Sequence, residues 1–256
     1  MHPSAMAHMS RLIETYLRKD RSYQVLDFGS RISANQRSTH RDLLAAYSCS
    51  YTGVDVLPGR NVDLVMRRPY RIPLPSNSVD VVLTGQVFEH VPFFWASFME
   101  LARVLRPGGY IFMTVPSRGH THDVYDCWRF YPDSMRALAA LARLELKEGS
   151  TDLPPEGPDG RRFDYAGIDA RNAYWGDTAG VFRKPEHYRS REVWLFREVS
   201  VWWANRVGDL SGVTGTDVRH PARPREPLPP PRNRRSRALR SAYRTVRDLL
   251  QGRSSR

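Results

Sequence analysis

The strongest constraint on the fold is a regular alternation of apolar segments with segments of helical periodicity. Four apolar runs have the length and composition of buried strands: YQVLDFG at 23–29, YTGVDVL at 51–57, VDVVLTG at 79–85 and YIFMTVP at 110–116. Helical spacing marks RDLLAAYSC at 41–49 and FFWASFMELARVL at 93–105. Strands that alternate with helices pair in parallel. We therefore predict an α/β fold with a doubly wound, mostly parallel, Rossmann-like sheet.

The rest of the chain is divided by changes in composition. Residues 10–148 are expected to form the core domain, opening with a short helix. Residues 1–9 are expected to be disordered and to carry no function. Residues 149–218, which are rich in Gly, Asp and aromatic side chains, predict a substrate-side insertion or lid followed by closing elements. Residues 219–256 read as a Pro/Arg linker and a basic amphipathic helix.

The net charge of +12 is concentrated in that last segment. Residues 219–256 hold twelve arginines against two acidic residues, so the remainder is nearly neutral. Nucleic-acid binding by the core is therefore disfavoured. The tail is expected to be a solvated extension, or to contact a membrane surface or an anionic polymer.

The number of cysteines and the length of the apolar runs indicate the cellular compartment in which the protein is expected. There are two cysteines and no run of about 18 apolar residues. We expect a cytoplasmic protein, with peripheral attachment to a membrane as the variant that the tail allows.

Several polar residues directly follow the predicted strands. In an open parallel sheet, ligands bind beyond the carboxyl ends of the strands. Asp55 offers two acceptor oxygens in one plane, which suits the two hydroxyls of a ribose. Gly29 permits a tight turn and close backbone approach. The alternatives are that Asp27 is a helix N-cap and Asp55 a turn residue.

The order of motifs resembles one enzyme family. VLDFGS, YTGVDV, IPLPSNSVDVVLTGQVFEHV and ELARVLRPGGYIFMTVP follow one another at consistent spacing over about residues 22–147. In this respect the chain is similar to class I S-adenosylmethionine-dependent methyltransferases of the methyltransferase-11 type. The resemblance implies S-adenosylmethionine as cofactor. Within the family it leans toward glycan and natural-product O-methyltransferases.

The resemblance also implies a set of cofactor-binding residues. Asp27 and Gly29 would lie near the methionine end, Asp55 on the ribose, and residues 84–86 beside the sulfonium. The full set is Asp27, Gly29, Ser30, Arg31, Asp55, Val56, Met66, Arg67, Thr84, Gly85 and Gln86. Two positions depart from the family pattern. The glycine-rich loop is reduced to DFGSRIS, and an arginine at 67 or 68 stands where an acidic residue is common.

The segment PSRGHTHDVYDCWRFYPDSM, residues 116–135, supplies the catalytic candidates. Methyl transfer to a hydroxyl needs a positioned acceptor and benefits from a base. Imidazole suits that task near neutral pH, so His122 is the predicted base, assisted by Asp123 or His120. A divalent ion bound by His120, His122 and Asp123 is the alternative, but it is not favoured because no ligand spacing demands it, and no metal site is assigned. For DxWRF we favour a packed, salt-bridged corner.

Other notable residues receive structural interpretations. Glu89 and His90 are expected to be structural, at a helix start. The tryptophans at 194, 202 and 203 are expected to pack. Aromatic residues of the insertion can either stack on sugar faces or form a satellite core; these are Tyr165, Tyr174, Trp175, Phe182 and Tyr188.

The leading hypothesis is an O-methyltransferase acting on a sugar, a glycan intermediate or a small secondary metabolite. Its expected partner is thus a small-molecule or saccharide acceptor. A non-catalytic, methyltransferase-like binding or scaffold protein is the alternative, motivated by the reduced glycine loop. An NAD-dependent reductase is disfavoured because GxGxxG is absent after the first strand. The oligomeric state is not assigned.

Overall fold

The computed structural model describes residues 3–32, 36, 38–119, 125–152, 160–161, 176–208 and 210. The chain divides into two compact units, residues 1–209 and residues 210–256. Of the second unit only Leu210 is described.

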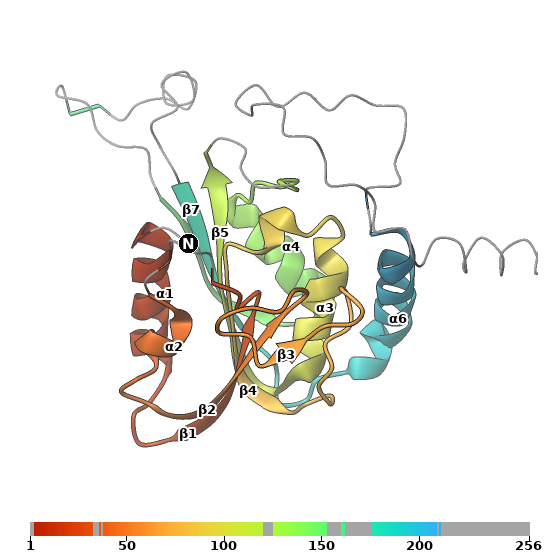
Figure 1. Cartoon of the computed structure of the whole chain (residues 1–256), viewed down its shortest axis with the longest axis horizontal. Coiled ribbons are helices and arrows are strands. Elements are labelled where there is room, and N and C mark those ends of the chain that lie inside the picture. Colours follow the sequence, from red (N-terminus) through yellow and green to blue (C-terminus); the bar gives the residue numbers. More distant parts are fainter. Residues whose placement is uncertain are drawn as a thin grey trace, which may run out of the picture. The chain divides into compact units, whose positions relative to one another are not determined.

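A seven-stranded sheet forms the centre of the first unit (Figure 1). The strand order is β3-β2-β1-β4-β5-β7-β6. The strands are β1 (Ser22–Phe28), β2 (Ser48–Asp55), β3 (Leu64–Val65), β4 (Val79–Gly85), β5 (Leu105–Arg118), β6 (Glu145–Thr151) and β7 (Gly176–Arg183). Strands β1 to β5 pair in parallel, whereas β7 is antiparallel to both β5 and β6. The predicted Rossmann-like, mostly parallel sheet is confirmed.

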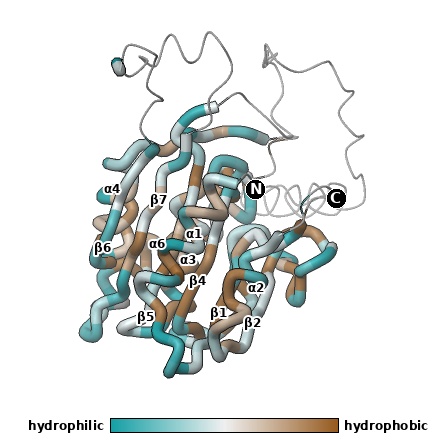
Figure 2. The backbone as a smooth tube through the Cα atoms, turned by 90° about the vertical axis from the view of Figure 1, so that its left-hand side faces the viewer, coloured by the Kyte–Doolittle hydropathy of each residue, from teal (hydrophilic) through white to brown (hydrophobic). Residues whose placement is uncertain are grey.

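Helices cover both faces of this sheet. They are α1 (Pro3–Tyr16), α2 (His40–Leu43), the 3-10 helix η1 (Phe88–His90), α3 (Phe94–Val104), α4 (Pro132–Ala142) and α6 (Ser190–Val207). Helices α1 and α2 lie on one side of the sheet, α3 and α4 on the other, and α6 lies outside α3 (Figure 1). Coverage of both faces explains why the central strands are almost continuously apolar, as Figure 2 shows.

Strand alternation assigns the apolar side chains to two core clusters. On β5, Ile111 and Met113 point to the cluster under α3 and α4, while Phe112 points to the cluster under α1. On β4, Val82 and Leu83 divide in the same way. The period of two places successive residues on opposite faces, so each strand contributes to both clusters.

The amino-terminal segment differs from the expectation of disorder. Helix α1 begins at Pro3, and the buried side chains of Ala5, Met9, Leu12 and Ile13 form one helical stripe against the sheet. The early part of this stripe consists of small residues and methionines, whose signal in the sequence is weak. The packing of Met9 and Leu12 nonetheless fixes the helix.

The insertion predicted at residues 149–218 includes part of the sheet. The proposed boundary after residue 148 falls within β6, and β7 pairs with β5 along almost its whole length. Strand β7 reads GDTAGVFR, with buried Asp177 and Thr178 and few large apolar residues. Its position in the sheet therefore depends on contacts with distant segments.

The tryptophans expected to pack do not. Trp194, Trp202 and Trp203 of α6 are 54%, 58% and 49% exposed. The buried face of the helix carries Val193 and Val201 instead. Within the described residues, no helix combines the length and the apolar character that crossing a bilayer requires.

Candidate active site

The loops after β1 and β2 meet at the carboxyl edge of the sheet. The backbone N–H groups of Gly29 and Ser30 both donate to the carbonyl oxygen of Val54, at 2.8 and 3.2 Å. The Arg31 N–H donates to Asp55 Oδ2 at 3.2 Å. Predicted site residues from two separate strands are thereby brought together at one edge.

Asp55 is the central acceptor of this edge. Its Oδ1 also accepts the N–H of Leu57, at 3.0 Å. A carboxylate can accept about four hydrogen bonds, so the two backbone bonds orient the group and leave acceptor capacity for a ligand. The next residue, Val56, exposes 44% of its surface, which provides an apolar platform beside the carboxylate. Asp55 and Val56 together suit a nucleoside, because its sugar carries hydroxyl groups and its base has a flat aromatic face.

Gly29 occupies a position that other residues fill only with strain. Its φ is +78°, and a Cβ atom there would lie 2.3 Å from Cγ2 of Val87. The close approach predicted for this glycine is therefore made, in the folded chain, to the segment that follows β4.

Asp27 is enclosed by protein partners. Its Oδ1 lies 2.8 Å from Nδ1 of buried His40, and its Oδ2 accepts the hydroxyl of Tyr51. Burial and the adjacent Asp27 carboxylate raise the pKa of Tyr51 above its ordinary value, so the phenol stays protonated and donates. The helix that follows is capped by Thr39, so Asp27 is not an N-cap. These partners could not be predicted from the sequence, because His40 and Tyr51 lie in other elements.

The end of β4 contributes residues 84–86. Thr84 is buried, and its hydroxyl has no hydrogen-bond partner among the described residues. Gln86 has a φ of +57° and donates through Nε2 to Asp177 Oδ1 at 3.1 Å. The hydroxyl of Ser4 also donates to Asp177, at 2.6 Å, so the first turn of α1 reaches the same edge.

Several buried polar atoms at this edge lack a hydrogen-bond partner among the described residues. The described part of the chain offers no hydrogen-bond partner to Ser30 Oγ, Thr84 Oγ1 or Gln86 Oε1. Such atoms are costly to bury unless something satisfies them. Met66 is buried in the core and approaches only through its backbone, while Arg67 is exposed.

Glu89 places a carboxyl group in an apolar setting beside this edge. It is fully buried, and neither carboxyl oxygen has a hydrogen-bond partner in the described ranges. Desolvation, together with the nearby carboxylates of Asp126 and Asp177, raises its pKa to about 8, while its own backbone N–H and Arg129 act in the opposite direction. Nε2 of His90 lies 3.5 Å from Glu89 Oε1. The structural role predicted for Glu89 did not anticipate a buried carboxyl group with a raised pKa. The signal in the sequence was the position of this carboxyl group within the apolar run VFEHV.

The DxWRF segment forms the packed corner that the sequence favoured. Arg129 donates to both oxygens of Asp126, at 2.5 and 2.9 Å. The rings of Trp128 and Phe130 pack edge-on against Phe94, at 5.3 and 5.2 Å. The N–H groups of residues 127 and 128 donate to the carbonyl oxygen of Glu89. This interpretation is confirmed.

The predicted catalytic residues His120, His122 and Asp123 lie outside the described residues. The described residues on either side of them are held near Glu89. Arg129 donates to the carbonyl of Gly119 at 3.3 Å, and Nδ1 of His90 lies 2.5 Å from the carbonyl oxygen of Tyr125. No group of metal-ligating side chains occurs in the part of the chain that the structure describes.

Five aromatic residues of the insertion are candidates for sugar stacking or for a satellite core. The structure describes two of these five, Phe182 and Tyr188, and both pack against the core. Phe182 is buried against Phe98, with ring centroids 4.9 Å apart. The hydroxyl of Tyr188 donates to the carbonyl of Ala142 at 2.8 Å. For these two the satellite-core alternative holds, and Tyr165, Tyr174 and Trp175 lie outside the described ranges.

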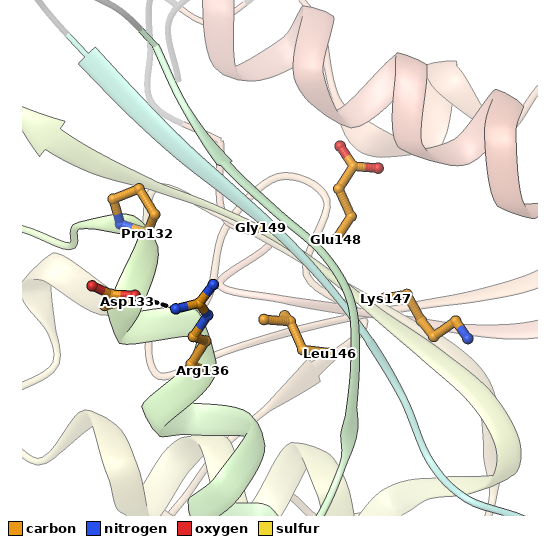
Figure 3. Close-up of a pocket in the computed structure, with 7 residues that line it drawn as sticks. All are labelled: Pro132, Asp133, Arg136, Leu146, Lys147, Glu148 and Gly149. Atoms are coloured by element: carbon orange, nitrogen blue, oxygen red, sulfur yellow. Dashed lines mark hydrogen bonds and ion pairs between the residues drawn. The ribbon is translucent and has the colours of Figure 1, made fainter.

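A shallow pocket of about 190 Å³ lies elsewhere, between α4 and β6 (Figure 3). Asp133 and Arg136, paired at 3.1 Å, and Glu148 are among its lining residues. The Asp133 and Arg136 side chains are 87% and 79% exposed, so this is a polar surface hollow separate from the edge described above.

The comparisons with known proteins begin with a family model. A model described as a methyltransferase domain matches residues 31–113. An uncharacterized methyltransferase of Schizosaccharomyces pombe is 45% identical over 42 residues, and one of Mycobacteroides abscessus is 53% identical over 38 residues. These alignments cover 16% and 15% of this chain and 15% of each relative, so they span only a small part of either protein.

Solved structures share the fold at low identity. The [4+2]-cyclase SpnF superposes with a TM-score of 0.52 at 15% identity, covering 71% of this chain and 82% of SpnF. The 1,6-didemethyltoxoflavin-N1-methyltransferase of Burkholderia thailandensis, solved with S-adenosylhomocysteine, gives 0.50 at 16% identity, covering 71% and 79%. The class I methyltransferase fold is thus established for this chain.

Proposed function

We propose that this chain, whose residues 31–113 match a methyltransferase-domain model, transfers a methyl group from S-adenosylmethionine to a hydroxyl group. The acceptor class that the motif resemblance favours is a sugar, a glycan intermediate or a small secondary metabolite. We place the reaction in the cytoplasm.

The observation that carries the cofactor proposal is the placement of Asp55. Its carboxylate is oriented by backbone N–H groups from two loops, and exposed Val56 follows it. In the proposed complex Asp55 accepts the ribose hydroxyls and Val56 contacts the adenine. The unpaired atoms of Ser30, Thr84 and Gln86 then have polar groups of the methionine portion to bind. When bound, the sulfonium supplies an electrophilic methyl group.

The proposed reaction requires a residue that removes the proton of the acceptor hydroxyl. The protein would have to hold the acceptor hydroxyl in line with the methyl group that the bound cofactor would supply, and a base would take the hydroxyl proton. We retain His122 as that base, with Asp123 or His120 assisting. Buried Glu89 is the second group proposed to accept the proton. It lies near Gly119 and Tyr125, the described residues that come before and after His122 in the sequence.

Binding of the cofactor is tested by Asp55→Asn in the full chain. The amide keeps the volume but loses the negative charge and one acceptor, so affinity for S-adenosylhomocysteine is expected to fall roughly 10- to 100-fold by calorimetry. Asp133→Asn, an 87% exposed position on α4, is the matched control and should bind as the unchanged chain does. Equal affinity for the Asp55 variant would refute the assignment, and no binding by the unchanged chain would favour the scaffold alternative.

Turnover against pH separates the two candidate bases once an acceptor is in hand. A histidine base makes kcat/KM rise with a midpoint near 6.5, whereas Glu89 makes it rise with a midpoint near its raised pKa of about 8. Removing the acting base by His122→Ala or Glu89→Gln is expected to lower kcat by about 10²- to 10⁴-fold. If both variants keep full activity, proton removal by either residue is excluded.

A further inference from the structure

The outward surface of α6 carries an unusual concentration of large apolar side chains. This surface, the aromatic face of α6, consists of Trp194, Leu195, Phe196, Val199, Trp202 and Trp203. Each exposes 49–64% of its surface. Single exposed apolar residues are common, but six on one helix form the kind of patch that marks an interaction surface.

The described part of the chain leaves this face largely exposed. The opposite side of α6 packs Val201 and Ala204 against Tyr70 and Ala96 of the first unit. Because α6 packs through Val201 and Ala204 on one side, the aromatic face is a second apolar side, which the described residues do not cover.

Polar contacts hold α6 in one orientation. Arg71 donates to both oxygens of Glu198, at 3.0 and 3.1 Å. Asn205 Oδ1 accepts the N–H of Tyr70 at 3.1 Å. These bonds fix the rotation of the helix about its axis, so the aromatic face is presented outward as a rigid surface.

Positive charge accompanies the aromatic face. Exposed Arg191 and Arg206 lie in the first and last turns of α6, and the Arg206 guanidinium lies 5.7 Å from the ring of Trp202. The sequence that follows contains the twelve arginines of residues 219–256. The aromatic face of α6 is therefore followed in the sequence, after residues 204–218, by a basic segment.

We propose that the aromatic face of α6 docks the protein on the surface of an anionic lipid membrane. Tryptophan favours the boundary between headgroups and acyl chains, where its ring is apolar and its N–H remains hydrated. Arginines at the helix ends reach lipid phosphates. Stable attachment of a peripheral protein generally takes an apolar insertion together with a basic cluster, and this chain has both.

Charge favours this occupant over a second copy of the chain. In two copies, residues 219–256 would each carry a net charge of +10, and these charges repel. An anionic bilayer attracts the same charge. The three exposed tryptophans fit an interface that is apolar on one side and aqueous on the other.

The test is co-flotation of the full chain with phosphatidylcholine vesicles, with and without phosphatidylglycerol. We expect binding to the anionic vesicles and weaker binding to the neutral ones. The triple variant Trp194→Ser, Trp202→Ser, Trp203→Ser should lower the partition coefficient roughly tenfold or more, because three large side chains no longer bury apolar area. Tyr131→Ser, a 52% exposed aromatic outside α6, is the matched control and should bind as the unchanged chain does.

Three results would overturn the proposal. The first is no flotation of the unchanged chain with anionic vesicles. The second is equal flotation of the triple variant, shown to be folded by an unchanged urea midpoint. The third is a lipid-free dimer, measured by light scattering, that the triple variant converts to monomer; this result would assign the aromatic face to a second copy.

Discussion

Glu89 couples the stability of the fold to pH. Its pKa is about 8 in the folded chain, against an ordinary value of 4.5. Between these two values the folded chain holds a proton on Glu89 that the unfolded chain has released. Stability therefore decreases as pH rises through this interval, by at most about 1.4 kcal/mol per pH unit. Above pH 8 both states are ionised, and the penalty is complete.

Glu89→Gln is expected to remove this dependence. The glutamine side chain keeps the shape but does not titrate. The difference in unfolding free energy between the variant and the unchanged chain should therefore grow in favour of the variant from pH 5 to pH 8. Urea unfolding at several pH values measures this difference, and other titrating groups cancel in it. A difference that stays constant with pH would show that Glu89 is ionised in the folded chain.

Gly29 shows how a reduced glycine loop still holds its conformation. Its positive φ and its contact with Val87 impose two separate restrictions on the same residue. A side chain at this position pays about 1–2 kcal/mol for the left-handed backbone, and in addition meets Val87 at an impossible distance. The single glycine that remains in DFGSRIS is thus required by the fold as well as by any ligand.

Gly29→Ala is expected to lower the unfolding free energy by about 2–4 kcal/mol. Adding Val87→Ala removes the methyl groups that a new Cβ would meet at 2.3 Å. In a double-mutant cycle, Gly29→Ala should therefore destabilise the Val87→Ala chain less than it destabilises the unchanged chain. The loss in unfolding free energy that remains should be close to the cost of the left-handed backbone alone. Additive effects in urea unfolding would mean that the loop moves to avoid Val87.

At the scale of elements, a buried lysine ties three segments together. Lys184, at the end of β7, donates to the carbonyl oxygens of Ala102 and Leu105, both at 2.7 Å, and to Asn77 Oδ1 at 2.8 Å. The two carbonyls belong to the carboxyl end of α3 and the start of β5. Burial, together with Arg197 and Arg103, lowers the pKa of Lys184 to about 8. The side chain acts as a C-terminal cap for α3.

Lys184→Met is expected to lower the unfolding free energy by about 2–4 kcal/mol, because buried carbonyl groups lose their donor. Lys147→Met makes the same chemical change at a side chain that is 44% exposed, and should change stability by less than about 0.5 kcal/mol. Chemical denaturation of both variants provides the comparison. Equal effects would remove the capping role.

Elements with strong local signals are the ones that the sequence predicted. Strands β1, β4 and β5 contain apolar runs, and α3 has clear periodicity. By contrast, β7 is a sequence of small and polar residues, and α1 begins with small ones. Their placement depends on contacts with distant parts of the chain, which a single sequence does not display. The outward tryptophans of α6 show the same limit, because helical periodicity does not reveal which face is covered.

For the whole molecule, the candidate site divides into a predictable half and an unpredictable half. The residues proposed for the cofactor follow strand ends directly, so the topology of a parallel sheet brings Gly29, Asp55 and Gln86 to one edge. The charged environment of Glu89 comes from the DxWRF corner and β7, two segments far from it in the sequence. No local pattern could indicate that Asp126, Asp177 and Arg129 surround one carboxyl group.

The position of β7 also has a consequence for synthesis on the ribosome. Strand β6 is translated before β7 but pairs in the sheet only with β7, and β5 keeps one open edge until β7 arrives. A nascent chain that has emerged only to residue 175 therefore exposes the unpaired edge of a long apolar strand, a template for association with other chains. Translation of residues 176–183 completes the sheet, and we expect it to be the step after which the nascent chain no longer needs protection by a chaperone.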